Sequence, residues 1–294
     1  MNVLISGAHG LIGSTLSAKL RSAGHSVTAL TRSPRPGAIG WDPDAGRLEG
    51  GQLEGFDAAV HLAGESIASG RWTAAKKKEI LDSRVRGTRL LSETLAKLTQ
   101  KPATLVLASA IGYYGHRPGE VLDESSSAGQ CFLAEVCRQW EAAADPAKQA
   151  GIRTAHTRFG IVLSPKGGAL KPLLTVAKLG LGGPVGNGRQ MWSWIALEDV
   201  AGALVHALTQ DDLSGPVNVV APNPVPQREF AATLGRVLGR PALMPLPAFA
   251  ARLILGQMAS ELLLPDQRVR PARLLDSSYR FAFTDLETAL RAML

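Results

Sequence analysis

Cysteine and aromatic residues are scarce in this chain of 294 residues, with two cysteines and 5% aromatic side chains. Cys131 and Cys137 are six positions apart on a predicted helix and point to different faces, so neither a disulfide nor a metal-binding pair is expected. The histidines show no spacing typical of metal ligands, and they stand at positions 9, 25, 61, 116, 156 and 206. We therefore predict no metal site.

The chain also lacks a long uninterrupted apolar run. Its most apolar late stretch, 243–264, contains two prolines and two charged residues, which argues against a membrane span. No charged and then apolar leader precedes Val3, because an apolar strand begins at once, and this argues against a signal peptide. We expect a cytoplasmic protein with no membrane partner.

Positive charge exceeds negative charge, giving a formal net charge of +7. The only tight basic run is Lys76-Lys77-Lys78, and no aromatic residues interleave with it, so it is typical of a solvated helix face. We predict no nucleic-acid partner. The excess charge suits an anionic cofactor or substrate instead.

Three regularly spaced glycines stand near the start of the chain, at Gly7, Gly10 and Gly13. They follow a short apolar strand and precede a helix marked by Ile12, Leu16 and Leu20 at helical spacing. This order brings a pyrophosphate to a helix N-terminus, where unpaired N–H groups and the helix dipole favour negative charge. The pattern predicts a dinucleotide site; the alternative is a glycine-rich turn without a ligand.

Strand and helix patterns alternate after this turn. Strands are predicted at 25–30, 57–64, 103–108 and 154–158, with a long helix at 73–98. The alternation indicates an α/β fold of the Rossmann type, a doubly wound parallel sheet with crossover helices. Ligands bind such sheets beyond the carboxyl ends of the strands.

The end of the second predicted strand bears on the choice of cofactor. An NAD site usually places Asp or Glu there, but this chain has Thr31 and Arg32, with no acid before Asp42. A guanidinium pairs with the 2′-phosphate of NADP, which a carboxylate would repel. We predict NADP(H) in preference to NAD(H), unless Arg32 is only an exposed loop residue.

Several segments together resemble the extended short-chain dehydrogenase/reductases of the NAD(P)-dependent epimerase/dehydratase family. They are S-G-A-H-G-L-I-G at 6–13, D-A-A-V-H-L-A-G at 57–64, S-R-V-R-G-T at 83–88, A-S-A-I-G-Y-Y-G at 108–115 and S-W-I-A-L-E-D-V-A-G-A at 193–203. The tail is similar to the small C-terminal domain of an atypical branch, the "epimerase family" proteins of undefined substrate, some of which are linked to cell division. Its markers are E-F-A-x-x-L at 229–234, L-G-R-P at 238–241, P-L-P at 245–247 and L-G-Q at 255–257.

The glycine turn, the strand ends and this resemblance together imply a set of cofactor contacts. They are Gly7, His9, Gly10, Leu11, Ile12, Gly13, Thr31, Arg32, Leu62, Ala63, Gly64, Glu79, Arg84, Ala108, Arg158, Gly160 and Val162. Glu79 and Arg84 are included because the branch places cofactor-contacting groups on that helix. An ordinary pair on the helix surface is the alternative for these two.

The catalytic Tyr-x-x-x-Lys pair of orthodox members is absent. The matching positions are Leu133 and Cys137, or Phe132 and Val136 if the register shifts by one. The usual serine position is Ala110, with Ser109 beside it.

Other residues would have to move a proton, and the catalytic candidates are Tyr113, Glu65 and Ser109. Tyr113 follows a strand end and is either a proton donor or an aromatic wall of the site.

A long glycine-rich loop at 182–194 ends in a cation and two aromatic residues. Long loops often carry binding residues, so Arg189, Trp192 and Trp194 are the predicted substrate contacts. A buried contact between two domains is the alternative for either tryptophan.

We predict two domains: an NADP-binding Rossmann domain of residues 1–164 and 191–221, and a smaller, mostly helical domain of residues 165–190 and 222–294. The cleft between them would hold the substrate. The first functional hypothesis is an NADP(H)-dependent oxidoreductase or epimerase acting on a small polar molecule, with sugar-like molecules among the candidates. The second is a catalytically silent NADP(H)-sensing regulatory protein that acts through a protein partner. Both hypotheses are compatible with a homodimer.

Overall fold

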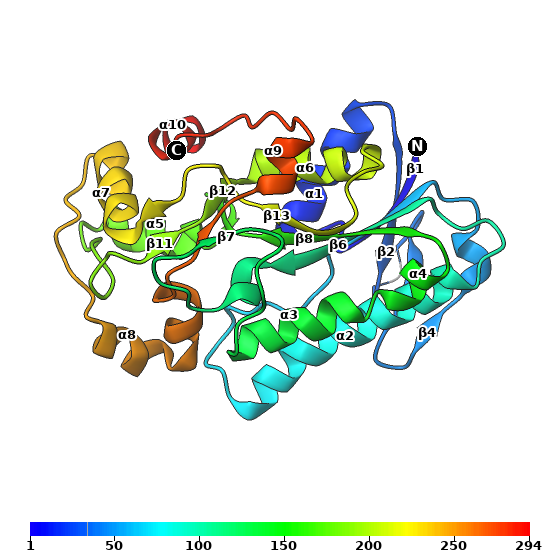
Figure 1. The fold of residues 1–294 in the computed structure, drawn as a ribbon, viewed down its shortest axis with the longest axis horizontal. Coiled ribbons are helices and arrows are strands. Elements are labelled where there is room, and N and C mark those ends of the chain that lie inside the picture. The colour runs from blue at the N-terminus through cyan, green and yellow to red at the C-terminus, as the bar shows by residue number, and fades with distance from the viewer. Residues whose placement is uncertain (34) are drawn as a thin grey trace.

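The computed structural model describes residues 1–33 and 35–294, and an eight-stranded sheet runs through its centre (Figure 1). The strands lie in the order β13-β8-β6-β5-β1-β2-β3-β4, and every neighbouring pair is parallel except β3 with β4. Their bounds are β1 Asn2–Ser6, β2 Ser26–Thr31, β3 Ile39–Asp42, β4 Arg47–Leu48, β5 Ala58–His61, β6 Thr104–Ala110, β8 Arg153–Phe159 and β13 Gly215–Val219. The order reverses at β1, and such a switch point opens a crevice at the carboxyl ends of the strands.

Helices cover both faces of this sheet, so its central strands are apolar on both sides. One face carries α1 (Leu11–Ser22) and α6 (Leu197–Thr209), and the other carries α2 (Ala74–Ala96), α3 (Phe132–Ala142) and α4 (Asp145–Gln149) (Figure 1). Alternate residues of β6 serve the two layers. Val106 packs in the core with α1 and α6, whereas Leu105 and Leu107 pack in the core with α2 and α4.

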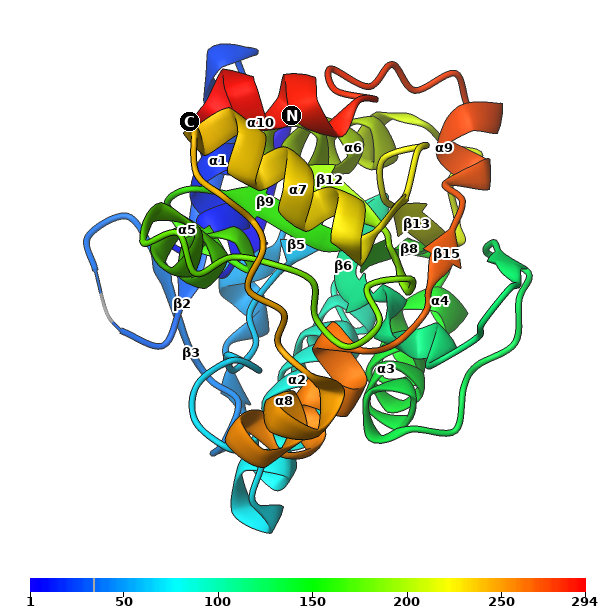
Figure 2. The same cartoon turned by 90° about the vertical axis from the view of Figure 1, so that its left-hand side faces the viewer.

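A smaller group of elements lies at one end of the sheet (Figure 2). Short strands pair there: β9 with β10 and β12, and β11 with β14. The bounds are β9 Ile161–Ser164, β10 Gly167–Gly168, α5 Leu170–Lys178, β11 Met191–Trp192, β12 Trp194–Ala196, β14 Val225–Pro226, α7 Gln227–Leu238, α8 Ala248–Leu255, a π-helical turn η3 at Ala259–Leu263 and α10 Leu286–Met293. Side chains from α5, α7, α10 and β12 share a core of their own.

The C-terminal tail does not stay within this smaller group. β15 (Arg268–Val269) pairs with β7 (Val121–Leu122), and α9 (Ala272–Asp276) packs against β13. Tyr279 and Phe281 then pack on the core beside α6, where the buried Asp199 accepts the backbone N–H groups of residues 282 and 283. Part of the segment 222–294 thus belongs to the large core, and the two-domain division stays a proposal.

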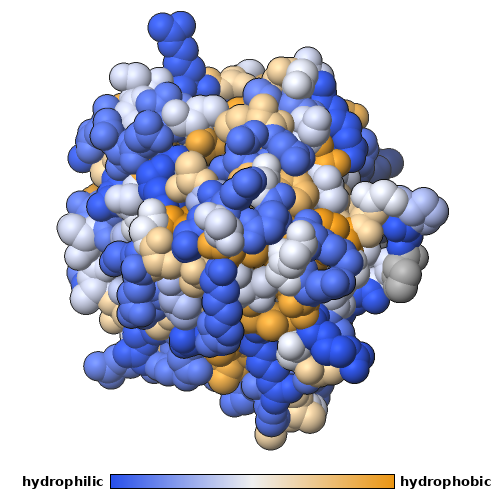
Figure 3. Space-filling model, turned by 90° about the vertical axis from the view of Figure 1, so that its right-hand side faces the viewer, coloured by the Kyte–Doolittle hydropathy of each residue, from blue (hydrophilic) through white to orange (hydrophobic). Residues whose placement is uncertain are grey.

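The predicted fold class is confirmed, with small shifts at element ends. The helix predicted at 73–98 spans 74–96, and the strand predicted at 103–108 spans 104–110. The sequence did not predict β3, β4 or the 3₁₀ turns η1 (Gly50–Leu53) and η2 (Ile111–Tyr114). No helix in the described part of the chain has the length and apolar character to cross a bilayer. Hydrophilic residues dominate the face in Figure 3, where apolar residues are scattered.

Candidate functional site

The glycine turn, residues 7–13, is held by contacts that leave no room for side chains. Gly7 has a φ of 72°, and its carbonyl accepts the N–H of Gly10 at 2.9 Å. A Cβ atom on Gly13 would lie 2.1 Å from the Gly7 carbonyl oxygen, and one on Gly7 would lie 2.9 Å from the Ala63 nitrogen. Gly10 is the N-cap of α1 and offers no side chain to the first N–H groups of that helix. The turn therefore presents unpaired donors beside β5, as a phosphate site requires.

A buried histidine helps to fix the carboxyl end of β5 against β1. His61 is fully buried, and its Nδ1 is hydrogen-bonded to Ser6 Oγ at 2.6 Å. Ser6 Oγ also accepts the N–H of Leu62 at 3.2 Å, so the start of the segment 62–64 is tied to the end of β1. Burial lowers the pKa of His61 to about 4, so the ring is neutral at physiological pH.

The end of β2 presents an unpaired cation. Arg32 is exposed and makes no ion pair or side-chain hydrogen bond with the described residues. Thr31 Oγ1 accepts the N–H of Ser33 at 3.2 Å, which shapes the turn before it. No carboxylate occupies positions 31–33. The guanidinium is thus available to an anion.

Arg84 is a second cation without a carboxylate partner among the described residues. Its guanidinium carbon lies 5.0 Å from the centre of the Trp140 ring, and Nη1 donates to the Ile80 carbonyl at 3.1 Å. A Cβ atom on Gly64 would lie 3.5 Å from the same guanidinium carbon. Burial lowers the pKa of Arg84. A partly buried charge that contacts no carboxylate in the described part of the chain, set near the end of β5, is a group that a polar ligand would stabilise.

Glu65 and Glu79 share a lysine on the rim of the site. Lys76 Nζ donates to Glu65 Oε1 at 2.6 Å and to Glu79 Oε2 at 3.1 Å. The Lys76 hydrogen bond is the main reason that the pKa of Glu65 is lowered. Glu65 is therefore a carboxylate at neutral pH, which is unsuited to donating a proton.

Ser109 belongs to a buried polar network under the carboxyl ends of β6 and β8. Its Oγ donates to Glu141 Oε1 at 2.7 Å, and the same carboxylate accepts two hydrogen bonds of 2.8 Å from Arg158. Arg158 Nη1 also donates to the Tyr114 hydroxyl at 3.0 Å, which donates to Asn218 Oδ1 at 2.7 Å. Burial opposes the Arg158 charge, but its contacts with Glu141 raise its pKa. Ser109 is 2% exposed and already paired, which argues for a structural role.

Tyr113 lies on the outer side of this network. The Arg158 guanidinium carbon lies 3.4 Å from the centre of the Tyr113 ring, a cation–π contact that holds the ring in place. Tyr114 meets the same ring edge-on at 5.3 Å between centroids. Tyr113 is half-buried, and its hydroxyl makes no hydrogen bond within the described residues. Among the three catalytic candidates, Tyr113 alone has an unused proton.

The positions expected for the orthodox pair hold inert groups. Leu133 packs beneath Gly112, and Cys137 Sγ lies 3.6 Å from the Ala110 carbonyl oxygen. Burial raises the pKa of the Cys137 thiol to about 12, so it is neither a nucleophile nor a proton relay near neutrality.

Three of the predicted cofactor contacts pack against other parts of the protein. Ala108 is buried in β6, and Val162 lies in β9, packed against the large core. A Cβ atom on Gly160 would lie 2.4 Å from the Ser193 carbonyl oxygen, so this glycine permits close packing of two chain segments. His9 is exposed beside the glycine turn, and Leu11 contacts the β9–β10 hairpin at Gly167 and Gly168.

Trp192 and Trp194 are core residues, 3% and 0% exposed. Their indole N–H groups already donate to the carbonyls of Leu263 and Asn223. This placement corrects the expectation that they contact substrate and favours the alternative of a buried contact. Arg189, by contrast, is exposed and lines a cavity of about 300 Å³.

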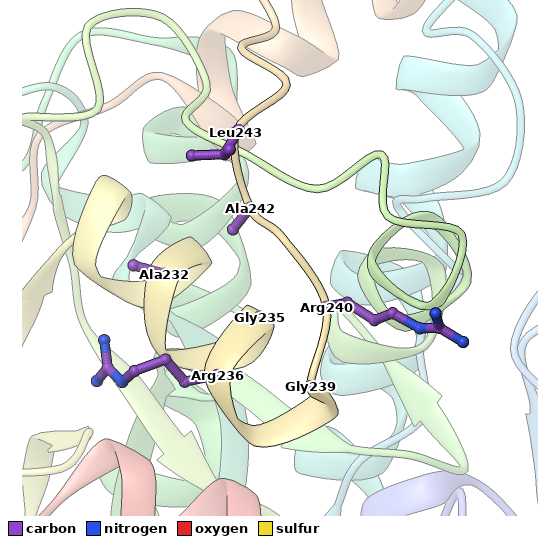
Figure 4. Close-up of a pocket in the computed structure, with 7 residues that line it drawn as sticks. All are labelled: Ala232, Gly235, Arg236, Gly239, Arg240, Ala242 and Leu243. Carbon is purple, nitrogen blue, oxygen red and sulfur yellow. The ribbon is translucent and has the colours of Figure 1, made fainter.

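A second hollow, of about 290 Å³, lies on α7 and the segment after it (Figure 4). No residue at a strand end of the large sheet lines it, and one of its arginines, Arg236, pairs with Glu287 at 3.0 Å. We therefore place the candidate site at the carboxyl ends of the large sheet instead. Across residues 1–33 and 35–294, no three His, Cys, Asp or Glu side chains are grouped as metal ligands.

The sequence of the chain matches two known families. Residues 3–220 match the "NAD dependent epimerase/dehydratase family", and residues 246–293 match a domain of unknown function, DUF1731. Epimerase family protein Mb2239 of Mycobacterium bovis is 42% identical over 290 residues, which cover 98% of this chain and 96% of the relative. Human epimerase family protein SDR39U1 is 39% identical over 99% of each chain. The predicted resemblance is confirmed.

Solved structures agree with these matches. Human SDR39U1 (isoform 2), crystallised with NADPH, superposes with a TM-score of 0.91 at 38% identity, covering 100% of this chain and 99% of that one. A nucleoside-diphosphate sugar epimerase of Corynebacterium glutamicum gives a TM-score of 0.83 at 38% identity, covering 100% of this chain and 58% of that one. UDP-N-acetylglucosamine 4-epimerase of Bacillus cereus, at 17% identity and a TM-score of 0.78, shares the fold.

Proposed function

This chain belongs to the NAD-dependent epimerase/dehydratase family, and from that premise we propose that it binds NADPH and uses it on a small polar substrate. The observation that carries the proposal is the glycine turn, whose backbone packing leaves the first N–H groups of α1 free beside β5. These donors would hold the diphosphate through main-chain hydrogen bonds. The similar human protein was crystallised with NADPH.

The preference for NADPH over NADH rests on Arg32. Its exposed guanidinium follows β2 without a carboxylate neighbour in positions 31–33, and it would pair with the 2′-phosphate. A carboxylate at this place would instead accept hydrogen bonds from the ribose hydroxyls of NAD.

Arg84 would serve the other half of the cofactor. Its guanidinium lies against Gly64, just beyond the carboxyl end of β5. There it would contact a phosphate or ribose oxygen and gain an anionic partner in addition to the Ile80 carbonyl. Because the guanidinium stacks on Trp140, little conformational freedom remains to be lost on binding.

NADPH supplies a hydride when bound, and Tyr113 is the residue of this chain suited to supply a proton. The Arg158 guanidinium lies over the Tyr113 ring and limits its movement, and Glu141 in turn pairs with Arg158. The hydroxyl of Tyr113 would donate to a substrate carbonyl as negative charge develops there. Reduction or epimerisation of a small polar carbonyl or sugar-like molecule is the chemistry that this arrangement supports.

A second candidate function, NADPH sensing without turnover, is favoured by the residues on α3. Leu133 and Cys137 stand where orthodox members carry tyrosine and lysine, and neither transfers a proton near neutrality. A protein of this kind would report cofactor occupancy to a partner protein.

Cofactor titration of Arg32→Ala tests the binding proposal. We expect the Kd for NADPH to rise about tenfold or more, since a charge-assisted hydrogen bond contributes about 1.5–3 kcal/mol, while the Kd for NADH stays unchanged. Arg21→Ala, an exposed arginine in the last turn of α1, is the matched control and should bind both nucleotides like the unaltered protein. If Arg32→Ala raised the Kd values for NADPH and NADH equally, Arg32 would not be the residue that binds the 2′-phosphate.

Turnover separates the two candidate functions. NADPH oxidation is followed over a panel of aldehydes, ketones and nucleotide sugars, with Tyr113→Phe alongside. If Tyr113 donates the proton, Tyr113→Phe should lower the rate about 10²–10⁴-fold and leave the Kd for NADPH unchanged. Tight NADPH binding without turnover of any compound would favour the sensor.

A further inference from the structure

A cavity of about 300 Å³ lies where the large and small groups of elements meet. It is lined by the segment after η2, by the loop 186–190, by α8 and by residues 264–266. Its polar lining residues are His116, Asn187, Arg189, Gln190, Arg252 and Asp266. This volume is at the lower end of the range of about 300–1,000 Å³ found for small-molecule sites.

Positive charge in this cavity is poorly neutralised by the protein itself. The side chain of Arg189 makes no hydrogen bond or ion pair with the described residues, and Arg252 donates only to Ser260 Oγ, at 3.3 Å. The single carboxylate of the lining is Asp266, whose Oδ1 accepts the N–H of Met191 at 3.0 Å. The lining thus carries two guanidinium groups and one carboxylate.

His116 adds a hydrogen-bond donor of fixed identity. Its Nδ1 lies 2.9 Å from the backbone nitrogen of Asp266. A backbone N–H only donates, so Nδ1 accepts and the proton of the neutral ring stands on Nε2. That Nε2–H has no partner among the described residues.

We propose that this cavity binds the anionic group, a phosphate or a carboxylate, of a small hydroxylated substrate. This inference rests on the proposed function and names its substrate class. Arg189, Arg252 and the Nε2–H of His116 would hold the anion, and the second oxygen of Asp266 would accept a substrate hydroxyl.

The cavity lies within reach of Tyr113. Two residues, Tyr114 and Gly115, separate His116 from Tyr113, and such a stretch spans at most about 11 Å between the outer Cα atoms. Gln267 holds this stretch in place, since its Nε2 donates to the carbonyls of Ile111 at 3.0 Å and Gly115 at 2.9 Å. A substrate anchored by its anion would place a carbon a few bonds away against the tyrosine hydroxyl.

Calorimetric titration of the full chain tests the proposal, with and without NADPH. The probes are inorganic phosphate, glucose 6-phosphate, gluconate and, as the uncharged comparison, glucose. We expect saturable binding of at least one anion and none of glucose at the same concentration. Comparing the affinities for phosphate and gluconate shows whether the cavity prefers a phosphate or a carboxylate. In the double variant Arg189→Gln/Arg252→Gln, the affinity for that anion should fall at least tenfold.

Arg240→Gln is the matched control, because Arg240 lines the separate hollow on α7 (Figure 4). It should bind the anion like the unaltered protein, and thermal melting should show that all variants are folded. No saturable anion binding, or an equal loss in Arg240→Gln and the double variant, would overturn the proposal. NADPH titrated into the same variants keeps the two proposals apart, since an anion site without NADPH binding would contradict only the proposed function.

Discussion

The two sides of the candidate site are built in opposite ways. On the side of the large sheet, backbone lies against backbone, and a single added carbon on Gly13 would collide with Gly7. On the side of the smaller group, α8 turns Phe249, Leu253 and Ile254 to solvent, with exposures of 73%, 74% and 61%. Close packing permits only one backbone geometry at the glycine turn, whereas the exposed side chains of α8 can be substituted without disturbing a core.

Ion pairs repeat the contrast. Arg158 and Glu141, in the large part, are 3% and 14% exposed and form a buried pair. Arg236 and Glu287, in the smaller group, form a pair at 3.0 Å in which the arginine is 58% exposed. The same chemistry should therefore contribute very different free energies at the two places.

Glu141→Ala should give the largest effect. Removing this carboxylate leaves the Arg158 charge buried and unpaired, which costs about 3–5 kcal/mol in the free energy of unfolding. Glu287→Ala is the control on the other side and should cost less than about 1 kcal/mol. Urea denaturation measures the free energy of unfolding of both variants. Equal losses of stability would contradict the expectation that the buried ion pair matters more than the exposed one.

Acid should destabilise the large part chiefly through the buried His61. The pKa of His61 is about 4 in the folded protein against an ordinary 6.5, so the unfolded chain binds more protons between these values. The stabilisation is complete above pH 6.5 and is lost as the pH falls towards 4, by up to about 3 kcal/mol. His156 is partly buried; desolvation lowers its pKa, so it acts in the same direction.

Denaturation at a series of pH values checks this, with His61→Asn beside the unaltered protein. The variant should lose less stability between pH 6.5 and 4. The exposed His9→Gln serves as control and should follow the unaltered protein. A His61→Asn curve parallel to that of the unaltered protein would contradict the prediction.

Gly13→Ala should disturb both stability and cofactor binding. The added carbon would lie 2.1 Å from the Gly7 carbonyl oxygen, and overpacking of this kind costs about 1–3 kcal/mol. The Kd for NADPH should rise in a fluorescence titration, because the glycine turn must shift. Gly40→Ala meets no atom within 4 Å and should bind NADPH normally. Unchanged binding by Gly13→Ala would show that the tight turn is not needed.

Leu253→Ser should have the smallest effect. The side chain is 74% exposed, and surface substitutions of this kind change the free energy of unfolding by less than about 0.5 kcal/mol. A larger loss of thermal stability would mean that α8 is packed more firmly than its exposure indicates.

Residue pattern alone predicted the glycine turn and the strand and helix on either side of it, because the rules for these elements are local. Glycines at 7, 10 and 13 between a strand and a helix are read from thirteen consecutive residues, and the buried strands are continuous apolar runs. The network of Ser109, Glu141 and Arg158 could not be predicted from the sequence, because Ser109 and Glu141 are 32 residues apart and Arg158 is 17 residues further on. Only the packing of α3 on β6 and β8 brings them together.

The prediction that Trp192 and Trp194 contact substrate was wrong for a related reason. Trp192 and Trp194 follow a flexible-looking loop, but the pairing of β11 with β14 and of β12 with β9 turns both rings into a core. The sequence predicted that Glu65 takes part in moving a proton, but its hydrogen bond with Lys76 lowers its pKa and keeps it a carboxylate at neutral pH. The sequence did not single out His116, Arg252 and Asp266, because they come from distant segments and no local motif predicts a cavity lined by several separate segments.

The return of the tail to the large sheet has a consequence for biosynthesis. Leu274, Tyr279 and Phe281 complete the hydrophobic layer between α6 and β13, yet they follow both elements in the chain by a long intervening stretch. A nascent chain therefore exposes that layer until residues 274–281 have emerged from the ribosome. Emergence of this late segment, rather than of the amino-terminal half, is the event that completes the large core.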